Sequence, residues 1–231
     1  MSLAPLDSPP RFSSSLAQTW TQVACFSLLA GAALFQAGCG LMSNLIHASG
    51  ANMIPAKYEG LEDTTVAIVT MTDSSQYTDD IAARELSRRI GEILAQKVDD
   101  FNLVREDKIQ QWRDVNGWDS IDYQAIGEGV QAEKVVVIEL TGMKLREGST
   151  LYRGRADALI KVIDVETGTV DFVAQLDEFT YPTMAGQSTT ETTESRFRKL
   201  YLSMLAQEIG RLFHKYDSID RIALDSFIAR Q

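Results

Sequence analysis

Cys39 is the residue of this sequence with the most distinctive chemistry, because it directly follows a long apolar run near the start of the chain. The run covers residues 23–38, closes on the small residues Ala37 and Gly38, and is followed after the cysteine by Gly40. An apolar run partitions into a bilayer, small residues leave the backbone accessible to a peptidase, and a thiol can carry a thioether-linked lipid. Each buried methylene adds roughly 0.8 kcal/mol, so two or more acyl chains on Cys39 would anchor the protein firmly.

This pattern resembles a bacterial lipoprotein signal peptide with its lipobox. The resemblance implies that residues 1–38 are a signal peptide and that Cys39 becomes the lipidated N-terminus, carrying palmitate-type chains. It places the protein in the bacterial cell envelope, facing the periplasm and anchored in the outer membrane. Gln36 stands where such signals usually have leucine, which leaves cleavage of the leader open. The alternative is an uncleaved single-pass helix over residues 20–46, since no charge interrupts that stretch and a span needs roughly 20 apolar residues.

The charge balance limits what the protein can bind. Lys and Arg total 22 against 32 Asp and Glu, which gives a net charge of −10. An acidic protein gains nothing from neutralising phosphates, so nucleic acid is not an expected partner. It also has no electrostatic attraction to anionic lipid, so membrane contact is expected only through the lipid on Cys39. The second cysteine, Cys25, lies in the leader, so the mature domain is expected to have no disulfide.

The sequence offers no arrangement typical of a catalytic or metal site. A Ser or Cys nucleophile needs a base within hydrogen-bond reach. The two histidines are His47, just after Cys39, and His214, near the end of the last predicted helix, where a cation favours the helix dipole. Neither an H-E-x-x-H motif nor a cysteine pair is present to bind a metal. We therefore predict a protein that is not an enzyme and has no cofactor. The open alternative is a hydrolase that uses the carboxylate pairs Asp79-Asp80 or Asp99-Asp100.

Behind Cys39 the chain divides into a tether, one domain and a tail. Residues 40–56 contain no acidic or basic side chain except His47, and we interpret residues 39–62 as a lipidated flexible tether. Residues 63–216 are long enough for one ordinary domain. Residues 217–231 are expected to form a C-terminal tail with a short amphipathic helix.

Hydrophobic periodicity predicts the elements of this domain. Apolar and β-branched runs predict strands at 64–71, 101–105, 134–140, 151–165 and 169–179. Stripes at three-four spacing predict long helices at 80–98 and 194–216, with shorter helices at 107–115 and 120–130. The order is β-α-β-α-α-β-β-β-α, in which the first helix permits a parallel strand pair and the last three strands form an antiparallel meander. We expect an α/β (α+β) fold with a single mixed sheet and helices packed on it.

Arg153 and Arg155 alternate with Asp157 along the strand predicted at 151–165. Residues two apart on a strand point to the same face of a sheet. We expect these three side chains to form a solvated face with cross-strand ion pairs. The alternative is a groove for a partner, with Arg153 and Arg155 as its contacts. The Ser/Thr/Gly-rich segment 183–193 is predicted to be a mobile loop and a second contact surface.

Three local patterns resemble one protein superfamily. They are a strand at 66–71 followed by a long capped helix, a short helix at 125–131 leading through Ala132 into a buried strand, and a strand that ends in the Asp-x-x-Thr-Gly of residues 164–168. In this order behind a lipobox, they resemble the envelope lipoprotein α/β superfamily. That superfamily includes the curli secretion lipoprotein, the penicillin-binding-protein activator lipoproteins and the N-terminal domain of the Tol translocation protein. The resemblance covers about residues 64–216.

The resemblance implies a non-enzymatic interaction or assembly module that is held at a membrane and binds an envelope protein partner. Two other functions stay open at this point. One is an envelope hydrolase that uses carboxylates, and the other is a single-pass membrane-anchored structural protein. A deep pocket with two convergent carboxylates would favour the hydrolase, and a shallow surface with an exposed apolar patch would favour the module.

Overall fold

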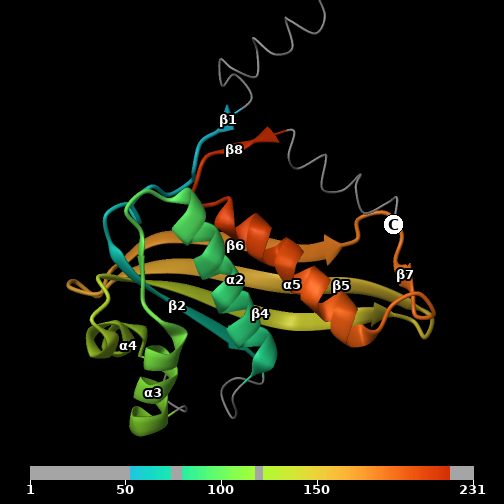
Figure 1. The fold of residues 1–231 in the computed structure, drawn as a ribbon, viewed down its shortest axis with the longest axis horizontal. Coiled ribbons are helices and arrows are strands. Elements are labelled where there is room, and N and C mark those ends of the chain that lie inside the picture. Colours follow the sequence, from blue (N-terminus) through green and yellow to red (C-terminus); the bar gives the residue numbers. More distant parts are fainter. Residues whose placement is uncertain (1–52, 74–79, 118–121, 219–231) are drawn as a thin grey trace, which may run out of the picture. The chain divides into compact units, whose positions relative to one another are not determined.

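The computed structural model describes residues 53–73, 80–117 and 122–218, which form a mixed sheet with helices packed on it (Figure 1). The strands are β1 (Met53–Ile54), β2 (Thr65–Thr72), β3 (Asn102–Leu103), β4 (Lys134–Glu147), β5 (Leu151–Asp164), β6 (Val170–Tyr181), β7 (Gln187–Ser188) and β8 (Tyr216–Asp217). The helices are α2 (Ile81–Lys97), α3 (Glu106–Asn116), α4 (Tyr123–Val130) and α5 (Glu194–Gly210). The expected mixed α/β class and the order of the main elements are confirmed; β1, β7 and β8 are short additions to them.

The main sheet has the strand order β3-β2-β4-β5-β6. β2 pairs in parallel with β3 and β4, and β4, β5 and β6 form the antiparallel meander. The hairpin between β5 and β6 depends on Asp164, whose carboxylate accepts hydrogen bonds from the Thr167 backbone N–H and hydroxyl, both at 2.9 Å. Gly168 follows with φ 69°, a conformation that glycine adopts without strain. The turn therefore forms at the Thr167-Gly168 pair that marks it in the sequence.

Helices cover both faces of the sheet, but unequally (Figure 1). On one face, α2 and α5 pack against each other and on the sheet, and their buried side chains share a core with Ile138 of β4 and Ile160 of β5. On the other face, α3 and α4 bury Ile109 and Ile126 against Val137 and its neighbours at the β2 and β4 end. Towards β6 this second face is polar, and the β5 side chains that point to it are exposed or half-exposed; they belong to Leu151, Arg153, Arg155, Asp157, Leu159 and Lys161.

Residues 53–62, expected within the flexible tether, belong to the folded domain instead. β1 pairs with β8, and the backbone N–H groups of Lys57 and Tyr58 both donate to the Leu212 carbonyl, at 2.8 and 3.0 Å. Leu61 is fully buried. The sequence indicates a tether here because the stretch continues the uncharged residues 40–56, and its pairing with β8 and Leu212 joins residues far apart in the sequence. Residues 1–52, which include the predicted signal peptide, Cys39 and His47, lie outside the described residues.

Three further boundaries differ from the prediction. The strand expected at 134–140 continues to Glu147, because residues 141–147 also pair with β5. The last helix was expected to reach residue 216 but ends at Gly210, which lets the chain turn and place β8 beside β1. The loop expected at 183–193 contains β7, which pairs with Leu151 and Tyr152 of β5. Of the predicted tail, Asp217 and Ser218 are described, and residues 219–231 are not.

Gly154 marks a close approach between β5 and α5, and we expect Gly154→Ala to destabilise the domain. A Cβ at this position would lie 2.0 Å from Cδ2 of Tyr201, whose ring is fully buried and whose hydroxyl donates to the Phe179 carbonyl at 3.0 Å. Overpacking of this kind costs about 1–3 kcal/mol. Thermal unfolding should show a melting temperature lower by several degrees. An unchanged melting temperature would mean that α5 can shift away from β5 without loss of stability.

Candidate functional site

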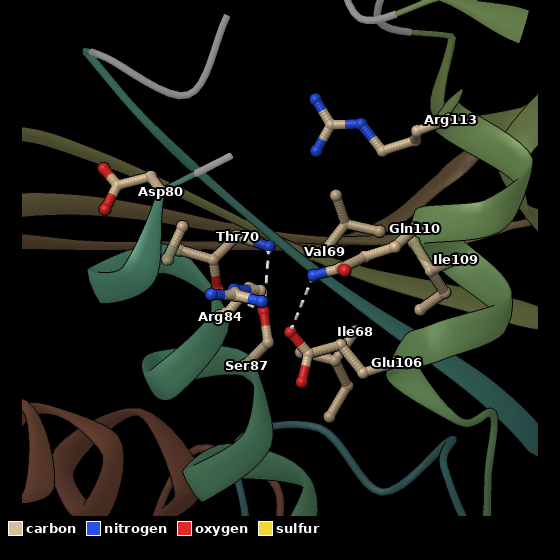
Figure 2. Close-up of a pocket in the computed structure, with 11 residues that line it drawn as sticks. Ile68, Val69, Thr70, Asp80, Arg84, Ser87, Glu106, Ile109, Gln110 and Arg113 are labelled. Carbon is tan, nitrogen blue, oxygen red and sulfur yellow. Dashed lines mark hydrogen bonds between the residues drawn. The ribbon is translucent and has the colours of Figure 1, made fainter. Parts of the chain in front are cut away.

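A crevice opens at the carboxyl end of β2, where the chain passes from one face of the sheet to the other. α2 follows β2 onto one face, and α3 follows β3 onto the opposite face. In open α/β sheets such a switch point is the usual place for a ligand. Polar side chains from three elements line it (Figure 2): Thr70 from β2, Asp80, Arg84 and Ser87 from the start of α2, and Glu106, Gln110 and Arg113 from α3.

The crevice is small, and its polar groups hydrogen-bond within it. The Ser87 hydroxyl donates to Thr70 Oγ1 at 2.8 Å and accepts from the Thr70 backbone N–H at 3.1 Å. Gln110 Nε2 donates to Glu106 Oε1 at 3.3 Å (Figure 2). Asp80 caps α2 by accepting from the Ala82 N–H at 2.7 Å. The free space is about 40 Å³, enough for a few water molecules.

Carboxylates do not converge there in the manner of an acid/base pair around a substrate. Asp80 and Glu106 lie on opposite sides of the crevice in Figure 2. Of the other carboxylates that the hydrolase alternative names, Asp99 and Asp100 lie in an exposed turn before β3, and Asp79 is outside the described residues. His214 follows α5, where its Nδ1 lies 2.9 Å from the Lys215 carbonyl and its ring meets Tyr216 edge-on. These positions favour structural roles for Asp80, Asp99, Asp100 and His214.

Arg153 and Arg155 lie on the polar face of β5 and make the cross-strand ion pairs expected of them. Both pair with Glu147 of β4, at 3.3 and 2.8 Å, and Arg155 also reaches Glu178 of β6 at 3.5 Å. Arg153 additionally donates to the carbonyls of Pro182 and Thr183, at 3.2 and 3.0 Å. The Arg153 side chain is 23% exposed and that of Arg155 is 41% exposed. Arg153 therefore ties β5 to the chain after β6, and Arg155 is the more accessible of the two.

A second polar network joins the starts of β4 and β6 to the end of β5. The Lys134 ammonium lies 2.7 Å from an Asp171 carboxylate oxygen and 3.4 Å from one of Asp164, and the Tyr58 hydroxyl donates to Asp171 at 3.2 Å. Burial lowers the pKa of Lys134, but its interactions with Asp171 and Tyr58 outweigh burial and raise that pKa above its usual value. The hydrogen bond from Lys134 lowers the pKa of Asp171, and hydrogen bonds from Thr167 lower the pKa of Asp164.

We expect this network to make the domain sensitive to acid. Carboxylates whose pKa is lowered by folding contribute stability above the unfolded pKa of about 3.9, and they lose it as the pH falls through the folded pKa. Lys134→Met removes the cation and keeps the apolar stem. The variant should be less stable at neutral pH, and its free energy of unfolding should fall less steeply below about pH 5. Urea unfolding at several pH values measures both effects.

The control for this prediction is Arg105→Met. Arg105 pairs with Asp107 at 2.6 Å, but the two side chains are 77% and 62% exposed, so their ion pair adds little to stability. The pH profile of Arg105→Met should follow that of the parent. A Lys134→Met profile parallel to that of the parent would contradict the role assigned to Lys134.

A larger groove lies between β6 and α5, on the face that α2 and α5 cover. Its volume is about 460 Å³. Leu176 and Phe179 of β6 and Met204 of α5 supply its apolar side chains, and Asp177, Glu208 and Arg211 supply its charges. Glu208 and Arg211 form an ion pair at 2.8 Å. The groove exists because β6 extends beyond the helices, so the β6 side chains that point to this face stay half-buried.

The sequence does not reveal this groove. The alternation of Phe172, Ala174 and Leu176 identifies an inward-facing side of β6. It does not reveal whether a helix covers that side, because coverage depends on where α5 lies across the sheet.

Within residues 53–73, 80–117 and 122–218, no helix combines the length and the apolar character needed to cross a bilayer. The same residues hold no group of three or more His, Cys, Asp or Glu side chains placed to bind a metal ion.

Comparison with known proteins gives structural similarities at low identity. No family model and no curated protein matches the chain. A dodecamer of a PelC variant from Paraburkholderia phytofirmans is 13% identical, with 70% of this chain and 96% of that chain covered and a TM-score of 0.40. Lipoprotein GNA1162 from Neisseria meningitidis is 9% identical, with 63% and 97% covered and a TM-score of 0.40. The LpoB C-terminal domain from Salmonella enterica is 16% identical, with 59% and 91% covered and a TM-score of 0.35. Similarities of this size assign neither a function nor a partner to this chain.

Proposed function

We propose that this chain is a lipid-anchored protein of the bacterial envelope whose domain binds a protein partner and turns over no substrate. One contrast within the domain carries the proposal. The charged crevice at the end of β2 has about 40 Å³ of free space, whereas the groove beside β6 has about 460 Å³ and an apolar floor. A groove that lies along a sheet edge and combines apolar with charged side chains suits an extended segment of a protein partner.

The proposed anchor is the lipid on Cys39, which is supported by the apolar run that ends in Ala37-Gly38. In this proposal the lipid anchor confines the domain to a thin layer at the outer membrane. Confinement raises the effective concentration of a partner in the same layer, so a modest interface is sufficient. In this proposal residues 39–52 form the tether, because the fold already includes residue 53.

The polar sheet face with Arg153 and Arg155 is a second proposed contact surface. The exposed apolar side chain of Val173, 57% exposed, lies on the same face of the neighbouring strand. The acidic net charge of −10 favours a partner that presents a basic or neutral patch.

Crosslinking in intact cells tests the proposal against the hydrolase alternative. The parent is compared with a variant in which Asp79, Asp80, Asp99 and Asp100 become Asn and His214 becomes Gln. We expect both proteins to give the same saturable partner complex, because Asp80, Asp99, Asp100 and His214 line neither the groove beside β6 nor the polar face of β5. Both should also be inactive on ester, amide and glycoside substrates. A hydrolytic activity that the parent shows and the variant lacks would overturn the non-enzymatic function.

A further inference from the structure

We infer that the edge of β6 and the groove beside it bind an extended segment of a partner protein, which adds to the sheet as a further strand. The segment would place alternate apolar side chains in the groove and a Lys or Arg near the carboxylates of Asp177 and Glu178. This inference rests on the proposed function, because it names the surface and the kind of segment that the partner presents.

The first support is the free edge of β6. Among the strands of the described residues, β6 pairs with β5 alone, so one of its edges carries no strand. Alternate backbone N–H and C=O groups of such an edge point outward and are ready to pair. The strand is 12 residues long, and the stretch from Phe172 to Leu176 pairs with β5 in unbroken register. This stretch is a regular template for an added strand.

The second support is the wall that α5 forms along the groove. Met204, Gln207, Glu208 and Arg211 all line the groove, and their spacing of three, one and three residues places them on one side of α5. All four side chains are half-buried, whereas Leu205, Ala206 and Ile209 between them are fully buried in the core. An edge strand beside a helix is an arrangement that binds peptides by strand addition, with backbone hydrogen bonds to the edge and alternate side chains in the groove.

The third support is the charge along the edge. β6 carries Asp171, Asp177 and Glu178 and no Lys or Arg. Asp171 is neutralised by Lys134 at 2.7 Å, whereas Glu178 is 71% exposed and its nearest cation, on Arg155, is 3.5 Å away. Asp177 is exposed and accepts a hydrogen bond from the neutral side chain of Gln175. The two adjacent carboxylates at residues 177 and 178 favour a basic side chain in the bound segment.

The same charges disfavour a second copy of this chain as the occupant. Pairing two β6 edges would bring acidic side chains together without a basic residue from either strand. Like charges on paired strands destabilise a sheet. The structure therefore favours a different protein with a basic, alternately apolar segment.

The test selects peptides and measures where they bind. The bait is the full chain with Cys39→Ser, presented to a phage library of random linear peptides. We expect the selected sequences to alternate apolar residues and to contain Lys or Arg. Hydrogen exchange with a selected synthetic peptide should then show added protection of β6 amides, centred on Phe172 to Leu176, because those amides gain partners in the new strand pair.

Two pairs of matched variants locate the site. Gln207→Trp fills the groove and should weaken binding of the selected peptide about tenfold or more, whereas Val115→Trp, at a position 79% exposed on α3, should not change it. Asp177→Lys should weaken binding of a basic peptide by a similar factor. Glu92→Lys, at a side chain 58% exposed on α2, should have little effect on that binding. Melting temperatures equal to that of the parent show that each variant is folded.

Several outcomes would overturn the inference. They are selected peptides without a basic or alternating pattern, protection confined to other strands, and equal affinity of parent and Gln207→Trp. Crosslinks from Met204 to residues 219–231 or to a second copy, in the absence of peptide, would identify a different occupant. If the partner complex in cells survives Gln207→Trp and Asp177→Lys combined, the inference fails and the proposed function stands. If no partner complex forms with the parent, the proposed function itself fails.

Discussion

Leu205→Ala is expected to lower the free energy of unfolding of the domain by about 2–5 kcal/mol. Leu205 is fully buried on the side of α5 that faces the sheet, in one core with Leu86, Ile138 and Ile160. Truncation removes apolar contacts and leaves a cavity that the surrounding strands fill only in part. Such a loss is a large share of the roughly 5–15 kcal/mol that stabilises a domain. Urea unfolding followed by circular dichroism gives the value.

Lys199→Ala is the matched control for this prediction. Lys199 lies on the same helix with its side chain exposed, and Lys and Ala differ little in helix propensity. Its unfolding curve should lie close to that of the parent. If Leu205→Ala also unfolds like the parent, then the buried side of α5 does not contribute to the core as the structure indicates.

Cys39→Ser is expected to move the protein from the membrane fraction to the soluble fraction of cells or to leave it unprocessed with its leader. A hydroxyl is a far poorer nucleophile than a thiolate, so the serine variant cannot accept the thioether-linked lipid. Without acyl chains an acidic domain has little affinity for an anionic membrane. Cell fractionation measures the change, and mass spectrometry of the parent should find an acylated peptide that begins at Cys39.

Cys25→Ser serves as the control, because Cys25 lies in the leader and has no role in the proposed anchor. Its membrane fraction should equal that of the parent. Intact peptides spanning residues 12–39 in the membrane-bound parent, with unchanged retention of Cys39→Ser, would instead support the single-pass alternative.

Local sequence determined where α2 and α4 begin and where the chain turns between β5 and β6. Asp80 and Asp122 cap α2 and α4 through hydrogen bonds to the backbone N–H groups of Ala82 and Ala125, and Asp164 forms the turn between β5 and β6. Each bond joins residues no more than three apart, so composition and spacing suffice to predict it. Apolar stripes likewise predicted which side of α2 and of α5 is buried.

Three of the two-residue strands could not be predicted in this way, whereas β3 lies within the apolar run predicted at 101–105. β1, β7 and β8 have two residues each, too few to show a periodic pattern. Their strand character comes from pairing with residues far away, as when Met53 pairs with Asp217. For the same reason Leu61 and Tyr58 appeared to belong to a tether, although Leu61 is buried and Tyr58 packs on Phe172 and Phe213.

The candidate sites also differ in whether the sequence indicates them or only the tertiary structure reveals them. The sequence alone proposes Cys39 as a lipid site, because such a signal is read from a continuous segment, and it placed Arg153 and Arg155 on one face of a strand through the two-residue period of β structure. Only the tertiary structure decided that Arg153 is tied to Pro182 and Thr183, and that α5 leaves β6 as an open edge beside a groove. Both facts depend on how separate elements lie across the sheet, and that arrangement is fixed by non-local packing.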